Sequence, residues 1–162
     1  MNAYIMAAGL GIRLRPKTEN VPKALLTVAG VPMLEYWLDS VNGCDEFEEV
    51  FVNIHHCARK IKSWIIGYNE RRNAHVKIID EEAGLLGTAG TLYWHGDFGE
   101  DFMVAYSDTF SWDFFKAIKD MASFWRSCPD KPLVGLVTFN VPEDGSAGAL
   151  EIDKFGTVTR FS

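Results

Sequence analysis

A segment near the N-terminus has residue types and spacing suited to binding phosphate groups. An apolar run of strand length ends at two glycines, Gly9 and Gly11, and two cations, Arg13 and Lys23, follow them. Glycine places no side chain between the backbone and a ligand, and it permits the positive φ angles that let successive N–H groups converge on an anion. We therefore predict that this segment holds a triphosphate. The predicted binding residues are Ala8, Gly9, Leu10, Gly11, Ile12, Arg13 and Lys23.

The spacing of these glycines excludes the two commoner glycine-rich phosphate loops. A P-loop needs a glycine, four residues and then Gly-Lys-Ser/Thr, and no such run occurs in the sequence. A dinucleotide-binding fingerprint needs a third glycine at position 14, which is Leu14. The glycines alone are equally typical of a tight turn between a strand and a helix, with no ligand. The prediction therefore depends on the whole constellation of loop and cations.

Asp108 is the carboxylate best placed to bind a metal. It lies two residues after the apolar run 102–106, which we expect to be a buried strand. Transfer of a nucleotidyl group normally needs a hard divalent cation, and an aspartate at a strand end is a usual ligand for one. The alternative is that Asp108 caps a helix that begins near Ser111.

A second glycine cluster, Gly87-Thr88-Ala89-Gly90, precedes an apolar stretch. Glycines at the start of a helix let the backbone approach a flat ligand, and Thr88 is suited to capping that helix. We predict that Gly87, Thr88 and Gly90 contact the nucleotide. A capped turn without a ligand is the alternative.

The histidines and cysteines are better explained by structure than by chemistry. His55 and His56 are adjacent at the end of an expected strand, so their side chains point in opposite directions and suit one metal poorly. We expect them to form a polar strand end that caps the next helix. Cys57 falls on an apolar helical stripe, which favours a core position over a nucleophile. No Gly-x-Ser-x-Gly context supports a hydrolase triad.

Composition limits the class of protein. The chain has 162 residues, 48% of them hydrophobic, and a formal net charge of −6. This length suits one domain, and the acidic balance argues against a nucleic-acid partner. No leader pattern or membrane-length apolar run is present, so we expect no membrane partner. The three cysteines lack a Cys-x-x-Cys pair, which predicts reduced, mostly buried thiols and a cytoplasmic location.

Apolar runs of strand length alternate with stretches of helical periodicity, and this order predicts an α/β fold. We expect a Rossmann-like three-layer sandwich, with a mostly parallel central sheet, helices on both faces and a C-terminal β-hairpin. In such sheets ligands bind beyond the carboxyl ends of the strands, where the glycine loop falls. The expected strands are 4–7, 50–54, 76–79, 102–106 and 133–139, the helical stripes are 33–41, 57–68 and 114–125, and the hairpin strands are 149–152 and 157–161.

The N-terminal constellation resembles the signature of the sugar-1-phosphate nucleotidyltransferases, or NDP-sugar pyrophosphorylases. That signature reads roughly Ala-Gly-Gly-x-Gly-Thr-Arg-Leu-x-Pro-x-Thr, then Pro-Lys-x-Leu after a short gap. The chain departs from it at Ala8, a common variant, and at Ile12, where the family usually has a hydroxyl near the phosphates. We expect the loss of that hydroxyl to weaken nucleotide binding. The matching positions are Gly9, Gly11, Arg13, Leu14, Pro16, Thr18, Pro22, Lys23 and Leu25.

The resemblance implies Mg²⁺-dependent transfer of a nucleotidyl group from an NTP to a sugar 1-phosphate, which yields an NDP-sugar and pyrophosphate. Arg13 would hold the leaving pyrophosphate, Lys23 would neutralise the α-phosphate and Asp108 would bind magnesium, so these three are the predicted catalytic residues. In the family the metal-binding aspartate follows a glycine, whereas here it follows Ser107.

The second glycine cluster resembles the family's Leu-Gly-Thr-Ala-Gly loop, which lies against the nucleoside. The same phrase recurs in guanylyltransferases that make GDP-mannose. It therefore favours a sugar phosphate as acceptor and a protein similar to mannose-1-phosphate guanylyltransferases, and it leaves the base open.

The tail, residues 148–161, resembles a later family segment. In the family a Glu-Lys-Pro follows, whose lysine contacts the sugar phosphate, and a second metal-binding aspartate comes later. We therefore expect residues 1–162 to form one truncated domain, with 1–140 as the nucleotide-binding core and 141–162 as the start of the acceptor-binding part. Such a chain is expected to bind NTP without useful transfer. Its uncovered sheet edge is expected to favour a homo-oligomer.

Two alternatives remain open at this point. Residues 14–20 also resemble the opening of phosphocholine cytidylyltransferases of the same fold. A non-catalytic regulatory or binding relative is the other alternative, and Ile12 adds weight to it.

Overall fold

The computed structural model describes residues 1–96, 101–109, 113–130, 132, 134–138 and 150–161. The chain divides into two compact units, Met1–Cys128 and Pro129–Ser162. Every predicted site residue belongs to the first unit. The predicted division into a nucleotide-binding core and the start of an acceptor-binding part stays a prediction.

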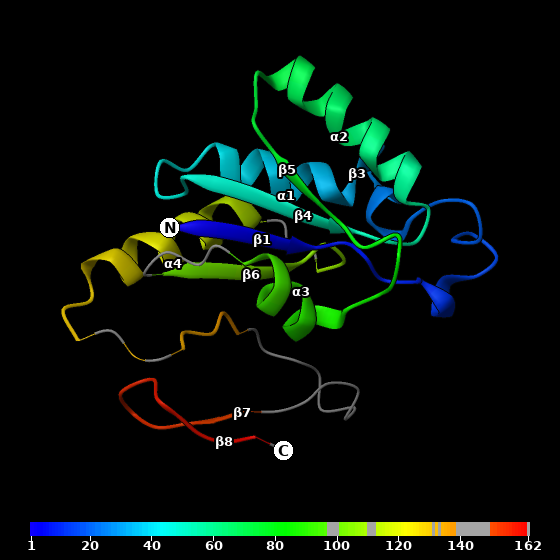
Figure 1. Ribbon diagram of the computed structural model, residues 1–162. Coiled ribbons are helices and arrows are strands. Elements are labelled where there is room, and N and C mark those ends of the chain that lie inside the picture. Colours follow the sequence, from blue (N-terminus) through cyan, green and yellow to red (C-terminus); the bar gives the residue numbers. More distant parts are fainter. Residues whose placement is uncertain (97–100, 110–112, 131, 133, 139–149, 162) are drawn as a thin grey trace. The chain divides into compact units, whose positions relative to one another are not determined.

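A four-stranded parallel sheet forms the centre of the first unit (Figure 1). Its strands are β1 (Asn2–Met6), β4 (Glu49–Ile54), β5 (Lys77–Asp80) and β6 (Phe102–Tyr106), in the order β5-β4-β1-β6. Met6 pairs with Asn53 on one side and with Tyr106 on the other. The carboxyl ends of β1, β4 and β6 therefore meet at one edge of the sheet.

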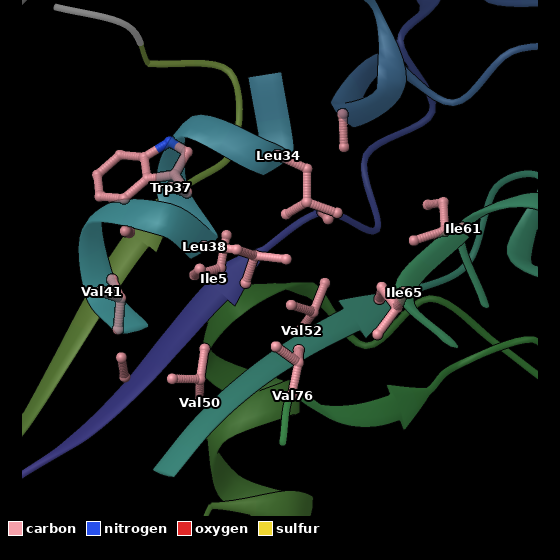
Figure 2. Close-up of a cluster of buried hydrophobic side chains, with 14 of the residues drawn as sticks. Ile5, Leu34, Trp37, Leu38, Val41, Val50, Val52, Ile61, Ile65 and Val76 are labelled. Atoms are coloured by element: carbon pink, nitrogen blue, oxygen red, sulfur yellow. The ribbon is translucent and has the colours of Figure 1, made fainter. Parts of the chain in front are cut away.

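The main core lies on one face of this sheet, beneath helices α1 (Met33–Asn42), α2 (Ala58–Arg72) and α4 (Phe114–Ser127). Ile5 and Val52 point from neighbouring strands toward Leu38 of α1 and Ile65 of α2, and all four are completely buried (Figure 2). Alternate residues along each strand supply this face, as the two-residue period of a strand requires.

Helix α3 (Gly87–His95) covers the opposite face of the sheet (Figure 1). The rings of Tyr4 and Phe51 stack there, with centroids 4.8 Å apart, and Leu92 of α3 packs against their cluster. The predicted α/β sandwich, with a mostly parallel sheet and helices on both faces, is confirmed.

Short elements connect β1 to α1. They are the 3-10 turns η1 (Ile12–Leu14) and η2 (Lys23–Leu25) and the two-stranded ribbon of β2 (Thr27–Val28) and β3 (Val31–Pro32). Helix α1 begins directly after Pro32 and ends before Gly43. Both boundaries agree with the sequence, because proline fixes a φ angle suited to a helix start.

Cys57 is not part of the helical stripe to which the sequence assigned it. It precedes α2 as the N-terminal boundary residue, with a φ of 52°, and its side chain is half-buried. Cys128 is also half-buried, so of the three free thiols Cys44 alone is buried. The apolar spacing of the residues that follow Cys57 extends back to it, so the sequence pattern placed Cys57 on the helix. The backbone turns at this residue, and the helix begins after it.

In the second unit, β7 (Leu150–Ile152) and β8 (Val158–Phe161) form the predicted antiparallel hairpin. The Asp153 carboxylate accepts hydrogen bonds from the N–H groups of Phe155 and Thr157 and so closes the turn.

The strand predicted over 133–139 is wrong for residues 134–138, which have no regular structure. Val134, Leu136 and Val137 are all more than half exposed. A strand needs a hydrogen-bonding neighbour and a buried face, and this apolar run has neither in the part of the chain that the structure describes. Residues 133 and 139 lie outside that part.

No helix among the described residues is both long and apolar enough to cross a lipid bilayer.

Candidate functional site

The loop that leaves β1 presents a run of free backbone donors. Among the residues that the structure describes, the N–H groups of positions 9–13 have no hydrogen-bond partner, whereas those of Ala7 and Ala8 both donate to the Asn53 side chain. Gly9 is open, since a Cβ added there would meet nothing within 4 Å. Unpaired donors in an accessible loop can bind an anion.

Gly11 anchors the far end of this loop. Its φ is 64°, and an added Cβ would lie 3.0 Å from the Cβ and Cγ2 atoms of Thr18. The buried Thr18 hydroxyl donates to the Gly11 carbonyl at 2.7 Å, and His56 Nε2 donates to the Thr18 carbonyl at 2.7 Å. Thr18 and His56 thus fix this end of the loop. The left-handed φ and the close contact with Thr18 both require glycine at position 11.

His56 supports the loop of positions 9–13 through Thr18, and His55 donates through Nδ1 to the Glu81 carbonyl at 2.8 Å. The two rings face different segments because adjacent strand-end residues point in opposite directions. The expectation that they cap α2 is wrong, since that helix has no side-chain cap. No cluster of three metal-ligating side chains occurs in the described parts of the chain.

The two predicted cations differ in their surroundings. Arg13 is exposed and has no bonding partner among the described residues. Lys23, at the start of η2, pairs through Nζ with Asp108 Oδ2, although the two residues are 85 positions apart in sequence. Their side chains are 23% and 36% exposed, so water and a ligand can reach this ion pair.

Asp108 is held at the sheet edge by its neighbours. Ser107 N–H donates to the Met6 carbonyl at 3.1 Å, and Thr109 N–H donates to the Tyr106 carbonyl at 3.1 Å. The alternative that Asp108 caps the next helix is wrong, because α4 begins at Phe114 and its N-cap is Asp113.

The second glycine cluster begins α3, as predicted. Gly87 has a φ of 70°, a conformation that favours glycine. Thr88 does not cap the helix; its hydroxyl lies 3.2 Å from the hydroxyl of Tyr106, at the end of β6. Gly90 fits closely beneath Leu86, since an added Cβ would lie 3.0 Å from the Leu86 Cβ.

A buried polar cluster that the sequence analysis missed links the end of β1 to the start of α3. Asn53, Glu81 and Thr91 are at most 4% exposed and hydrogen bond to one another. The available signal was Asn53, a polar residue between apolar neighbours in a strand expected to be buried. Its partners are 28 and 38 residues away, and a local pattern does not reveal them.

The arrangement suits a polyphosphate. It combines a run of free N–H groups, a free guanidinium, and an accessible ammonium–carboxylate pair at the carboxyl edge of a parallel sheet. Arginine's forked donors match phosphate oxygens, and lysine acts as a compact charge.

Comparison with known proteins agrees with this geometry. The sequence model described as nucleotidyl transferase matches residues 2–162. The chain belongs to this family. The N-acetylmuramate alpha-1-phosphate uridylyltransferase of Caulobacter vibrioides is 35% identical over 91 residues, which cover 56% of this chain and 37% of that protein. The choline-phosphate cytidylyltransferase of Streptococcus pneumoniae is 59% identical over 39 residues, which cover 24% of this chain and 17% of that protein.

The fold of the chain also matches solved structures. A UDP-glucose pyrophosphorylase from Acinetobacter baumannii superposes with a TM-score of 0.61 and 20% identity, covering 78% of this chain and 52% of that one. At that identity the likeness shows the fold alone. The chain spans about a third of the length of the first curated relatives that it matches.

Gly9 leaves space for a ligand, whereas Gly11 fixes the loop, and replacing each glycine by alanine should separate these two roles. We expect Gly11→Ala to lower the free energy of unfolding by about 1–2 kcal/mol, because it adds a strained left-handed φ and a clash with Thr18. Gly9→Ala, its matched control, should change stability by less than about 0.5 kcal/mol, since its Cβ enters open space. Urea denaturation measures both values, and equal losses would contradict the assigned roles.

Proposed function

We propose that this nucleotidyl transferase catalyses transfer from an NTP to a sugar 1-phosphate, with release of an NDP-sugar and pyrophosphate. The observation that carries the proposal is the unpartnered N–H run 9–13, which lies at the same sheet edge as the Lys23–Asp108 pair. Similarity to an N-acetylmuramate alpha-1-phosphate uridylyltransferase supports a sugar phosphate as acceptor.

In this proposal the N–H groups of Gly9, Leu10, Gly11 and Ile12 bind the triphosphate, and we call residues 9–13 the phosphate loop. Arg13 holds the β- and γ-phosphates, and Lys23 neutralises the α-phosphate. An oxygen of the acceptor phosphate attacks the α-phosphorus in line. The new P–O bond forms as the bond between the α-phosphorus and the bridging oxygen breaks, and pyrophosphate leaves with that electron pair. Positioning and charge neutralisation supply most of the catalysis.

We propose that Asp108 contributes the protein's ligand to Mg²⁺. Its carboxylate is a hard oxygen donor, accessible to solvent, and its Oδ1 has no partner among the described residues. Magnesium is usually held by one or two carboxylates together with substrate phosphates, so a single aspartate fits. When bound, the ion would neutralise phosphate charge.

The Lys23–Asp108 ion pair is compatible with these roles, because each residue has a charge of the sign opposite to that of its proposed ligand. If magnesium and NTP bound together, Asp108 would hold the metal and Lys23 would face the phosphate, so neither charge would be left unpaired. An accessible pair of this kind is weak enough for such an exchange, because exposed ion pairs contribute only about 0–1 kcal/mol.

The nucleoside would lie against the second glycine cluster. Gly87, Thr88 and Gly90 begin α3 close to Tyr106, at the sheet edge that carries the phosphate loop. We propose that these residues border the base and ribose. The three free thiols fit a cytoplasmic location, where nucleotides are supplied.

Phosphocholine is the second candidate acceptor. The specific observation is the 59% identity over 39 residues with a choline-phosphate cytidylyltransferase. Pyrophosphate release should be measured with each NTP, magnesium, and either a sugar 1-phosphate or phosphocholine. Release with the sugar phosphate supports the main proposal, and release with phosphocholine overturns it in favour of the second. Absence of NTP binding would favour a non-catalytic relative, because an interaction module has no need of the phosphate-binding residues.

Arg13→Ala should weaken binding of the Mg–NTP complex by about tenfold to a hundredfold, because a charged hydrogen bond contributes about 1.5–3 kcal/mol. Arg59→Ala is the matched control, since it removes the same charge from an exposed position on α2. Isothermal titration calorimetry measures both affinities. Equal affinities of the two variants would remove Arg13 from the site.

Asp108→Asn should abolish the magnesium dependence of NTP binding, because the amide keeps the shape but loses the charge that holds a hard cation. Its melting temperature should change little, since the lost partner is an accessible lysine. NTP titrations with and without magnesium provide the test. Magnesium dependence equal to that of the wild type would contradict the metal-binding role.

A further inference from the structure

The Glu81 carboxylate follows β5 and is 2% exposed. Its Oε1 accepts hydrogen bonds from Asn53 Nδ2 at 3.0 Å and from the Thr91 hydroxyl, and its Oε2 accepts from Leu86 N–H at 3.1 Å. A buried carboxylate needs such donors at both oxygens. Two of the three come from the segment that flanks Gly87–Gly90.

Asn53 extends this network to the phosphate loop. Its Oδ1 accepts hydrogen bonds from the N–H groups of Ala7 at 2.7 Å and Ala8 at 3.3 Å. The carboxylate of Glu81 accepts only, so the NH₂ side of the amide must face it and the oxygen must face the loop. Glu81 therefore sets the orientation in which Asn53 holds the loop.

We propose that Glu81 is a positioning residue that fixes the spacing between the phosphate loop and the first turn of α3, residues 87–90. This spacing lets one NTP bind to both segments. The inference rests on the proposed function, in which the two segments bind the two ends of the same nucleotide. No role in contacting the ligand is assigned to Glu81, because its carboxylate is enclosed by protein donors.

Stability alone does not explain a carboxylate at this position. Burial of a charged group carries a desolvation penalty, and well-packed apolar groups often replace buried charges without loss of stability. A carboxylate instead provides two oxygens that only accept, which orients three donors from separate segments at once. Orienting several donors at once matters where the phosphate loop and the start of α3 must keep one fixed geometry.

Glu81→Gln tests the proposal because it disturbs one side of the network more than the other. The glutamine oxygen can still accept from Asn53 and Thr91, whereas its NH₂ group would face the Leu86 N–H, donor against donor. The first turn of α3 should therefore lose its fixed position while the phosphate loop keeps its support.

Calorimetric titrations should use two probes, the Mg–NTP complex and inorganic tripolyphosphate with magnesium. We expect Glu81→Gln to weaken NTP binding by about tenfold or more, and tripolyphosphate binding by less than about threefold, because tripolyphosphate contacts only the first loop. Glu82→Gln is the matched control, since it makes the same chemical change at an exposed neighbour. It should leave both affinities unchanged.

A second pair of variants tests the proposal independently in case Glu81→Gln does not fold. Thr91→Ser keeps the hydroxyl that donates to Glu81, whereas Thr91→Val keeps the shape without it. We expect the serine variant to bind NTP as the wild type does and the valine variant to lose affinity. Amide hydrogen exchange at Leu86 should rise in Glu81→Gln and in Thr91→Val, and remain unchanged in Thr91→Ser.

Equal NTP affinity in Glu81→Gln and Glu82→Gln would overturn the proposal. An equal loss for both probes would also overturn it, because that result indicates general disruption of the fold. If the wild-type protein binds tripolyphosphate and NTP equally well, there is no joint site to position and the proposal fails. If it binds neither, the proposed function fails, and the proposal falls with it.

Discussion

One buried carboxylate, that of Glu81, connects the elements that carry the candidate site. Glu81 lies at the end of a strand in the interior, where a charge without hydrogen-bond donors would be strongly unfavourable. Its donors come from β4, from the segment before α3 and from α3 itself. The ends of separate elements must therefore keep a fixed arrangement at the carboxyl edge of the sheet. Both predicted nucleotide-binding loops start from that arrangement.

The proposed phosphate loop is open in the middle and fixed at its ends. Asn53 binds the N–H groups of Ala7 and Ala8, and Thr18 binds the carbonyl of Gly11 from below. The N–H groups between these anchors have no partner in the described structure. Such a loop does not need to reorganise in order to bind an anion, and preorganisation of this kind strengthens binding.

Much of this fold could be predicted because parallel strands buried on both faces form continuous apolar runs, and because Pro32 and Gly43 define a helix. Residues 133–139 are a similar apolar run in the sequence. Residues 134–138 nevertheless form no strand, because they are exposed, and burial decides whether an apolar run becomes a strand. The loop glycines and cations were also predictable, since they are close in sequence. The Lys23–Asp108 pair and the Asn53–Glu81 contact join residues distant in sequence, and only the folded chain brings them together.

The phosphate site is tested most directly by following the backbone amides by NMR as magnesium and NTP are added. We expect the ¹H–¹⁵N signals of residues 9–13 to shift most, because their free N–H groups bind the phosphates. The signals of Ala7 and Ala8 should shift less, since Asn53 already holds those groups. Saturating NTP that leaves residues 9–13 unshifted would contradict the central claim that this loop is the phosphate site.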